Sequence, residues 1–246
     1  KQGAPGGETT LEGDAGFYHA YAGSATGELR YSFTGKNRTD LADITKDLGR
    51  RWTFLETLYR IYSISGYNIA HVEVTAKLCA EHDLRYADID RIEALVNWFE
   101  TEYPSPAFRN PTMDGKPRVR STQYCTAYGA VERGYPITRP VDPTADETDP
   151  PEVLDLMHRV TLIPVVGRTL FGPRITIFTK DGRHYSKEGT GEEFIWDFEE
   201  QVRRIRPVTP ALPVPETQYV QLIDACRHLD RADTAAARLI ALTLAA

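Results

Sequence analysis

Two short stretches of the chain place a cation and hydroxyl groups at the start of a predicted helix. The first is residues 59–68 (YRIYSISGYN), where Arg60 and Ser65 precede a helix expected over 68–82. The first turn of a helix presents free N–H groups and a positive dipole, which suit a carboxylate. An arginine can hold the same carboxylate through two parallel hydrogen bonds. This stretch therefore indicates an acid-binding site, with a purely structural role as the alternative.

The second stretch is residues 120–124 (RSTQY), which places Arg120 and Tyr124 at the start of a helix expected over 121–133. A guanidinium can bind an anion there, and a phenol is both a hydrogen-bond donor and an acceptor. Taken alone, these residues also have a structural explanation.

Other kinds of chemistry lack their motifs. The six histidines include no i, i+4 pair and no HExxH, so we expect no metal site, and GxSxG, P-loop and GxGxxG patterns are absent. Cys79, Cys125 and Cys226 are scattered without a CxxC spacing, which is typical of a reducing compartment. His71 lies off the apolar face of the helix expected over 68–82, so we expect it to be exposed.

Charge and hydropathy exclude two broad classes of protein. The net charge is -6 and Lys116, Arg118 and Arg120 form the longest basic cluster, which we expect to be a solvated loop, so a general nucleic-acid binder is excluded. No run approaches the roughly 18 apolar residues of a membrane span. No signal peptide is visible, and we expect a cytoplasmic protein that binds neither nucleic acid nor membrane.

The order of predicted elements indicates an α+β fold. In the first half, a strand over 51–62, a helix over 68–82 capped by Asn68 and a strand over 92–99 follow one another, which is the pattern of a two-layer α/β unit. Beyond it we expect the helix over 121–133.

Turn and capping signals define the second half. Asp149 before Pro150 predicts the start of a helix that runs to about residue 159. An Asp181-Gly182 turn predicts a hairpin of 174–179 with 183–186. The Thr190-x-x-Glu193 capping box predicts a helix that continues to Ile205. Helices over 216–228 and 231–244 are expected to pack away from the α+β core, on another helical unit.

Several of these segments together resemble the MmgE/PrpD family, which includes 2-methylcitrate dehydratase, cis-aconitate decarboxylase and iminodisuccinate epimerase. The resemblance rests on residues 11–18 (LEGDAGFY), 59–78, 76–84, 88–93 (DIDRIE) and 121–124 (STQY). The hairpin and the terminal helices follow in the same order as in the family.

The resemblance implies a two-domain architecture of which this chain holds one part. Residues 1–49 would be the tail of a helical domain, 50–206 the smaller α+β domain, and 207–246 helices that return to the helical domain. Most of the helical domain, with its acidic and histidine catalytic positions, would be missing; the chain opens on Lys1 and a loop-like glycine-rich stretch. We therefore expect a partner chain that carries it, and a dimer of such pairs.

The same resemblance assigns roles to four residues. Tyr124 falls on the family's active-site tyrosine, Arg60 on a position that usually holds lysine, Ser65 where cysteine or histidine is common, and Arg120 where several members have histidine. An arginine stays charged, with a pKa above about 12. Arg60 can therefore clamp a substrate carboxylate but cannot serve as the general acid.

The expected function is that of a cofactor-independent lyase or isomerase subunit acting on a small polycarboxylic acid. Arg60 and Tyr124 would be catalytic and would face one acid-binding cavity, while Arg120 and Ser65 would bind substrate. Two alternatives stay open. The chain can be a non-catalytic scaffold or binding subunit, or a family member recruited to an unusual biosynthetic elimination or cyclisation.

Overall fold

The computed structural model describes most of the chain beyond residue 45: residues 46–52, 59–62, 64–102, 117, 119–136, 149–193, 195–211, 214–231 and 235–244. The predicted tail of the helical domain, 1–49, lies almost entirely outside these ranges, as do Lys116 and Arg118 of the basic cluster.

A four-stranded mixed sheet forms one layer of the molecule. Its strands are β1 (Ile89–Asn97), β2 (Val160–Val165), β3 (Arg174–Thr179) and β4 (His184–Glu188), in the order β2-β1-β3-β4. β1 pairs with β2 in parallel and with β3 antiparallel, and β3 pairs antiparallel with β4. The predicted strand in the range 92–99 and the predicted hairpin are confirmed.

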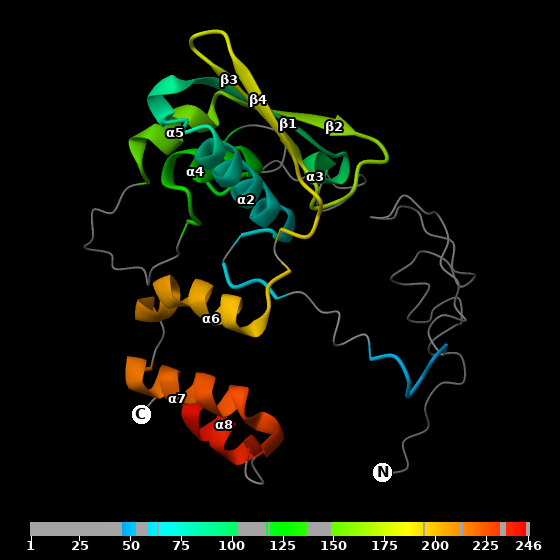
Figure 1. Ribbon diagram of the computed structural model, residues 1–246, viewed down its shortest axis with the longest axis vertical. Helices are drawn as coiled ribbons and strands as arrows, with labels where there is room; N and C mark the ends of the chain where they lie inside the picture. Colours follow the sequence, from blue (N-terminus) through cyan, green and yellow to red (C-terminus); the bar gives the residue numbers. More distant parts are fainter. Residues whose placement is uncertain are drawn as a thin grey trace.

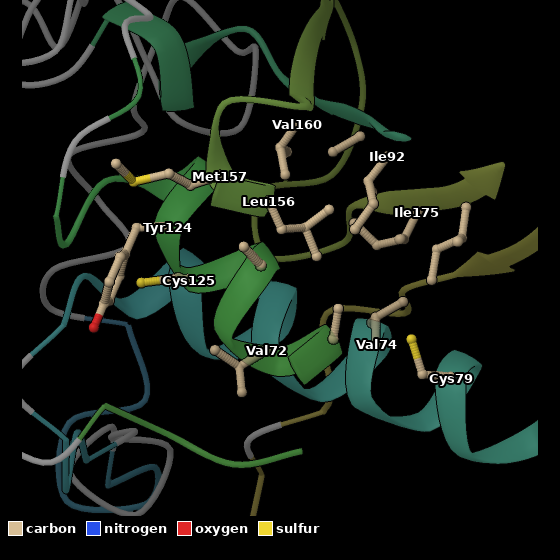
Figure 2. Close-up of a cluster of buried hydrophobic side chains, with 14 of the residues drawn as sticks. Val72, Val74, Cys79, Ile92, Tyr124, Cys125, Leu156, Met157, Val160 and Ile175 are labelled. Atoms are coloured by element: carbon tan, nitrogen blue, oxygen red, sulfur yellow. The ribbon is translucent and has the colours of Figure 1, made fainter. Parts of the chain in front are cut away.

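Helices cover one face of this sheet (Figure 1). They are α2 (Gly66–Glu81), α4 (Thr122–Glu132) and α5 (Pro151–Met157), with the short α3 (Phe99–Glu102) and the 3₁₀ turn η3 (Tyr86–Asp88) at either end of β1. The predicted α+β fold is confirmed. The helix-facing side chains of β1 and β3 meet α2, α4 and α5 in a fully buried core, part of which is drawn in Figure 2.

The last part of the chain is helical. It contains α6 (Phe198–Ile205), η4 (Arg206–Ala211), α7 (Glu216–Arg227), η5 (Leu229–Arg231) and α8 (Ala235–Thr243). In Figure 1, α6, α7 and α8 lie on the side of the helices remote from the sheet. The two expected terminal helices are therefore present and lie away from the α+β layer. None of the described helices has the length and apolarity that a membrane crossing requires.

Several local predictions were wrong or incomplete. Residues 51–52 and 59–62, the described part of the strand expected over 51–62, form no strand. The N-cap of α2 is Ser65 and not Asn68, which lies in the first turn. Only one bond of the expected Thr190–Glu193 capping box is present: the Glu193 carboxylate accepts from the Thr190 N–H. The Thr190 hydroxyl accepts from the N–H of Glu192 instead, and Asp197 caps α6.

A further discrepancy concerns β2, to which no element was assigned from the sequence. Its run contains Pro164, which cannot donate to a sheet and is tolerated only at an edge. β2 is an edge strand of this sheet. Only the tertiary structure supplies the neighbour, β1, that makes the run a strand.

Candidate functional site

Tyr124 lies in the first turn of α4, where the sequence predicted a helix start. Ser121 is the N-cap, and its hydroxyl accepts a hydrogen bond from the backbone N–H of Tyr124 at 3.2 Å. The Tyr124 side chain is 1% exposed, and its hydroxyl donates to Asp149 Oδ1 at 2.5 Å. Figure 2 shows this hydroxyl directed away from the hydrophobic cluster. The result is a phenol–carboxylate pair at the border of the core.

The environment of Tyr124 keeps its proton in place. Burial, followed by the hydrogen bond to Asp149 and the negative charge of that carboxylate, raises the pKa of Tyr124 far above its ordinary value near 10. Tyr124 is therefore a neutral hydrogen-bond donor at physiological pH and not a base.

Asp149 was expected to cap the helix that follows it. The structure gives that place to Pro150, and α5 begins at Pro151. The Asp149 carboxylate instead accepts the Tyr124 hydroxyl. Aspartate before two prolines has no signal that distinguishes the two uses, because the partner lies 25 residues away along the chain.

Arg60 and Ser65 lie together at the start of α2, as predicted. Arg60 is exposed, and its Nη1 donates to the carbonyl oxygen of Ile64 at 3.0 Å. A Cβ placed on Gly66, the first residue of α2, would lie 3.8 Å from Cδ of Arg60 and 3.1 Å from the Phe171 ring. The Ser65 hydroxyl makes no capping hydrogen bond. The guanidinium therefore belongs to a segment that passes close to the first residue of a long helix.

Arg120 stands immediately before the N-cap of α4, in the left-handed region with φ 67°. Arg120 is exposed, but its positive charge acts on the buried Cys125 thiol. Burial raises the pKa of the Cys125 thiol to about 12, and the positive charge of Arg120 opposes part of that rise. Arg120 is thus close enough to act electrostatically on the first turn of α4.

The four predicted residues thus form two pairs, one at each helix start. Arg60 and Tyr124 have different partners, Ile64 and Asp149, and the hydrogen bonds and ring contacts of the described residues include none between them. The common cavity expected for them stays a prediction.

The sequence-based expectation for His71 was wrong. His71 is 0% exposed; its Nε2 lies 3.0 Å from Glu100 Oε2 and its Nδ1 lies 3.0 Å from Thr126 Oγ1. Amphipathic periodicity assumes that one helix face meets water. Here residues 67–75 of α2 are all buried, so His71 lies in the interior together with the apolar side chains of this segment.

A second cluster lies two residues further along α2. Glu73 accepts a hydrogen bond from the Tyr135 hydroxyl at 2.6 Å and another from Arg204 Nη1 at 2.5 Å. The Tyr135 ring stacks on Tyr62 at 3.8 Å, and the guanidinium of Arg204 lies 4.3 Å from the centre of the Trp196 ring. Burial and Glu73 raise the pKa of the Tyr135 hydroxyl well above 10.

These groups border a groove of about 840 Å³ between α2, the end of α4 and α6. Lys77, Asp83, Glu132 and Arg203 stand among its lining residues. Glu73 and Arg204 neutralise each other's charge in an ion pair. The main role of this cluster is therefore to join α6 to the α+β layer.

Metal and family comparisons add no further assignment. Among the residues that the structure describes, no three His, Cys, Asp or Glu side chains gather in a way that could hold a metal ion. No known protein-family description matches the chain, and no curated protein matches it.

Proposed function

We propose that this chain is the α+β subunit of a cofactor-independent, MmgE/PrpD-like lyase or isomerase that acts on a small polycarboxylic acid. The observation that carries the proposal is the Tyr124–Asp149 pair. A neutral phenol at a helix start, oriented by a carboxylate and directed away from the core, has the properties of a hydrogen-bond donor that orients a reacting group.

Binding of the acid is assigned to the start of α2. The Asn68 N–H donates to the carbonyl oxygen of Ser65, and the Ser65 side chain makes no capping bond. Arg60 passes beside Gly66, the first residue of the helix. A substrate carboxylate would take hydrogen bonds from the helix start, from the Ser65 hydroxyl and from Arg60. Arg120 would hold a second carboxylate near Tyr124.

The proposed reaction begins with removal of a proton from the carbon next to a carboxylate. A base from the helical partner takes the proton, and the charge that develops on the enolate-like carboxylate is stabilised by Arg60. Tyr124 donates to the departing group or orients its donor. Acid–base steps of this kind contribute about 10²–10⁴-fold to a rate. Water loss and epimerisation share this start, whereas decarboxylation reaches a similar enolate-like carbanion by loss of carbon dioxide and then takes up a proton.

The terminal helices support the need for a partner chain. Val220 on α7 is 53% exposed, Ile240 on α8 is 62% exposed and Leu244 just beyond it is 63% exposed. Exposed apolar side chains on two neighbouring helices are candidates for an interface. We propose that a chain with the helical domain covers them, that two such pairs form a dimer, and that the complex works in the cytoplasm, where Cys79, Cys125 and Cys226 stay reduced.

The test is turnover of candidate polycarboxylic acids by this chain co-expressed with a helical MmgE/PrpD-like partner. Tyr124→Phe should lower kcat at least about 10²-fold. Tyr86→Phe is the matched control, because the Tyr86 hydroxyl donates to Asp155 at 2.7 Å in a similar pair at the surface. Unchanged turnover of the Tyr124→Phe complex would remove the phenol from the mechanism.

A scaffold role is the second candidate. It is favoured by the 1% exposure of Tyr124 and by the backbone carbonyl that already holds Arg60. For a scaffold, Arg60→Ala would weaken co-purification of the partner and leave turnover per complex unchanged. For the enzyme, the same change would raise KM while the complex stays intact.

A further inference from the structure

We infer that His71 is a positioning residue for Tyr124, acting through Thr126; this inference rests on the proposed function of Tyr124. His71, Glu100 and Thr126 come from α2, α3 and α4, and all three are at most 2% exposed. They form a continuous hydrogen-bonded chain across the interior.

The number of protons available to these hydrogen bonds determines which group donates in each of them. The Thr126 hydroxyl donates its one proton to the carbonyl oxygen of Thr122 at 2.8 Å, so it accepts from His71, and Nδ1 must carry a proton. The contact between Nε2 and Glu100 Oε2 then holds one more proton. Glu100 thereby fixes the orientation of the imidazole ring, as a carboxylate behind a histidine does in many sites.

Thr126 and Tyr124 lie on opposite sides of α4. At 3.6 residues per turn, two positions differ by about 200° around the axis. The hydrogen bond from His71 therefore restrains one side of α4, while Tyr124 contacts Asp149 from the opposite side. Rotation of α4 about its axis would break the first contact and misplace the second.

Close packing between α4 and α2 leaves α4 little room to shift. A Cβ on Gly129 would lie 2.7 Å from the carbonyl oxygen of Val72, so the backbones of α4 and α2 are in close contact at this point. The glycine sets the distance between the helices. The His71–Thr126 bond sets the rotation of α4, and with it the place of the phenol.

The test uses Thr126→Val, which removes the hydroxyl and keeps the shape. In the full chain, the Tyr124 hydroxyl proton is followed by ¹H NMR and is assigned by its loss in Tyr124→Phe. In Thr126→Val we expect this proton to shift and to exchange with water at least about tenfold faster, because a misplaced donor opens more often. Thr126→Ser should restore the wild-type signal.

The matched control is Thr75→Val. Thr75 is also 0% exposed and lies on α2, but its hydroxyl has no hydrogen-bond partner among the residues that the structure describes. This variant should leave the Tyr124 proton as it is, even if the melting temperature changes. An unchanged Tyr124 signal in Thr126→Val, or an equal effect in Thr75→Val, would overturn the positioning role.

In the assembled complex, Thr126→Val should lower kcat by one to two orders of magnitude, since small misplacements have effects of this size, and leave KM unchanged. If Tyr124→Phe proves fully active while the NMR result holds, the proposed function fails and the positioning of Tyr124 by His71 stands. An altered NMR signal with unchanged kcat in Thr126→Val would show that positioning does not matter for the reaction and would overturn this part of the inference.

Discussion

His71 and Glu73 are two residues apart on one helix, yet they serve two different kinds of joint. The inner cluster around His71 links α2, α3 and α4 inside the apolar core. The outer cluster around Glu73 links α2 to α6 at the edge of a groove. In the inner cluster, polar groups fix the orientation of helices that hydrophobic packing already holds together. In the outer cluster, an ion pair with aromatic neighbours is itself a main contact between α2 and α6.

The comparison predicts that the inner cluster is the more sensitive of the two. His71→Leu leaves the Glu100 carboxylate without its cationic or donor partner in a fully buried place. Loss of one partner from a buried pair lowers the free energy of unfolding by about 3–5 kcal/mol. Urea unfolding monitored by circular dichroism measures this change. His158→Leu at an exposed position is the control, and a similar loss there would contradict the assignment.

Packing of the inner region can be tested at its tightest point. Gly129→Ala places a methyl group 2.7 Å from the backbone oxygen of Val72, and backbone gives way less easily than a side chain. We expect a loss of about 1–3 kcal/mol, as for other overpacked cores. Gly134→Ala, where the nearest atom is 3.7 Å away, is the matched variant. Equal stability of the two variants would show that the helices can separate freely.

The outer cluster should yield a smaller and more local effect. Arg204→Met removes the partner of Glu73, and we expect a loss of about 1–2 kcal/mol, because water can reach the groove and replace part of the bond. Limited proteolysis should then release the segment from α6 to α8 faster than in the wild type. Arg227→Met breaks an exposed pair with Glu199 and should change stability by less than about 1 kcal/mol. Equal cleavage rates in both variants would contradict the claim that the outer cluster attaches α6 to α2.

The outer cluster should make the stability of the protein depend on alkaline pH through Tyr135. Its folded-state pKa is raised above the ordinary value near 10, so the folded chain holds this proton more tightly than the unfolded chain. The stabilisation is complete below about pH 10 and is lost as the pH rises above it, at up to about 1.4 kcal/mol per pH unit for each such group. Tyr135→Phe should flatten the stability curve between pH 10 and 11, measured by thermal melts. A curve as steep as that of the wild type would contradict this contribution.

Local signals determined most of the α+β layer. The Asp181-Gly182 turn forms as predicted, with Gly182 at φ 87°, a conformation that glycine adopts without strain. Ser121 caps α4, and Tyr124, Arg120, Arg60 and Ser65 lie at the helix starts that their neighbours define. Each of these features depends on residues a few positions apart, which a sequence displays directly.

Only the tertiary structure decided which polar groups meet. Arg204 reaches Glu73 across 131 residues, His71 reaches Thr126 across 55, and Tyr124 takes Asp149 away from its expected cap. Periodicity predicted an exposed His71 because it assumes one solvated face, whereas α2 is covered all round at that level by other parts of the chain. Such burial depends on what packs against a helix from elsewhere in the sequence, and no local pattern encodes it.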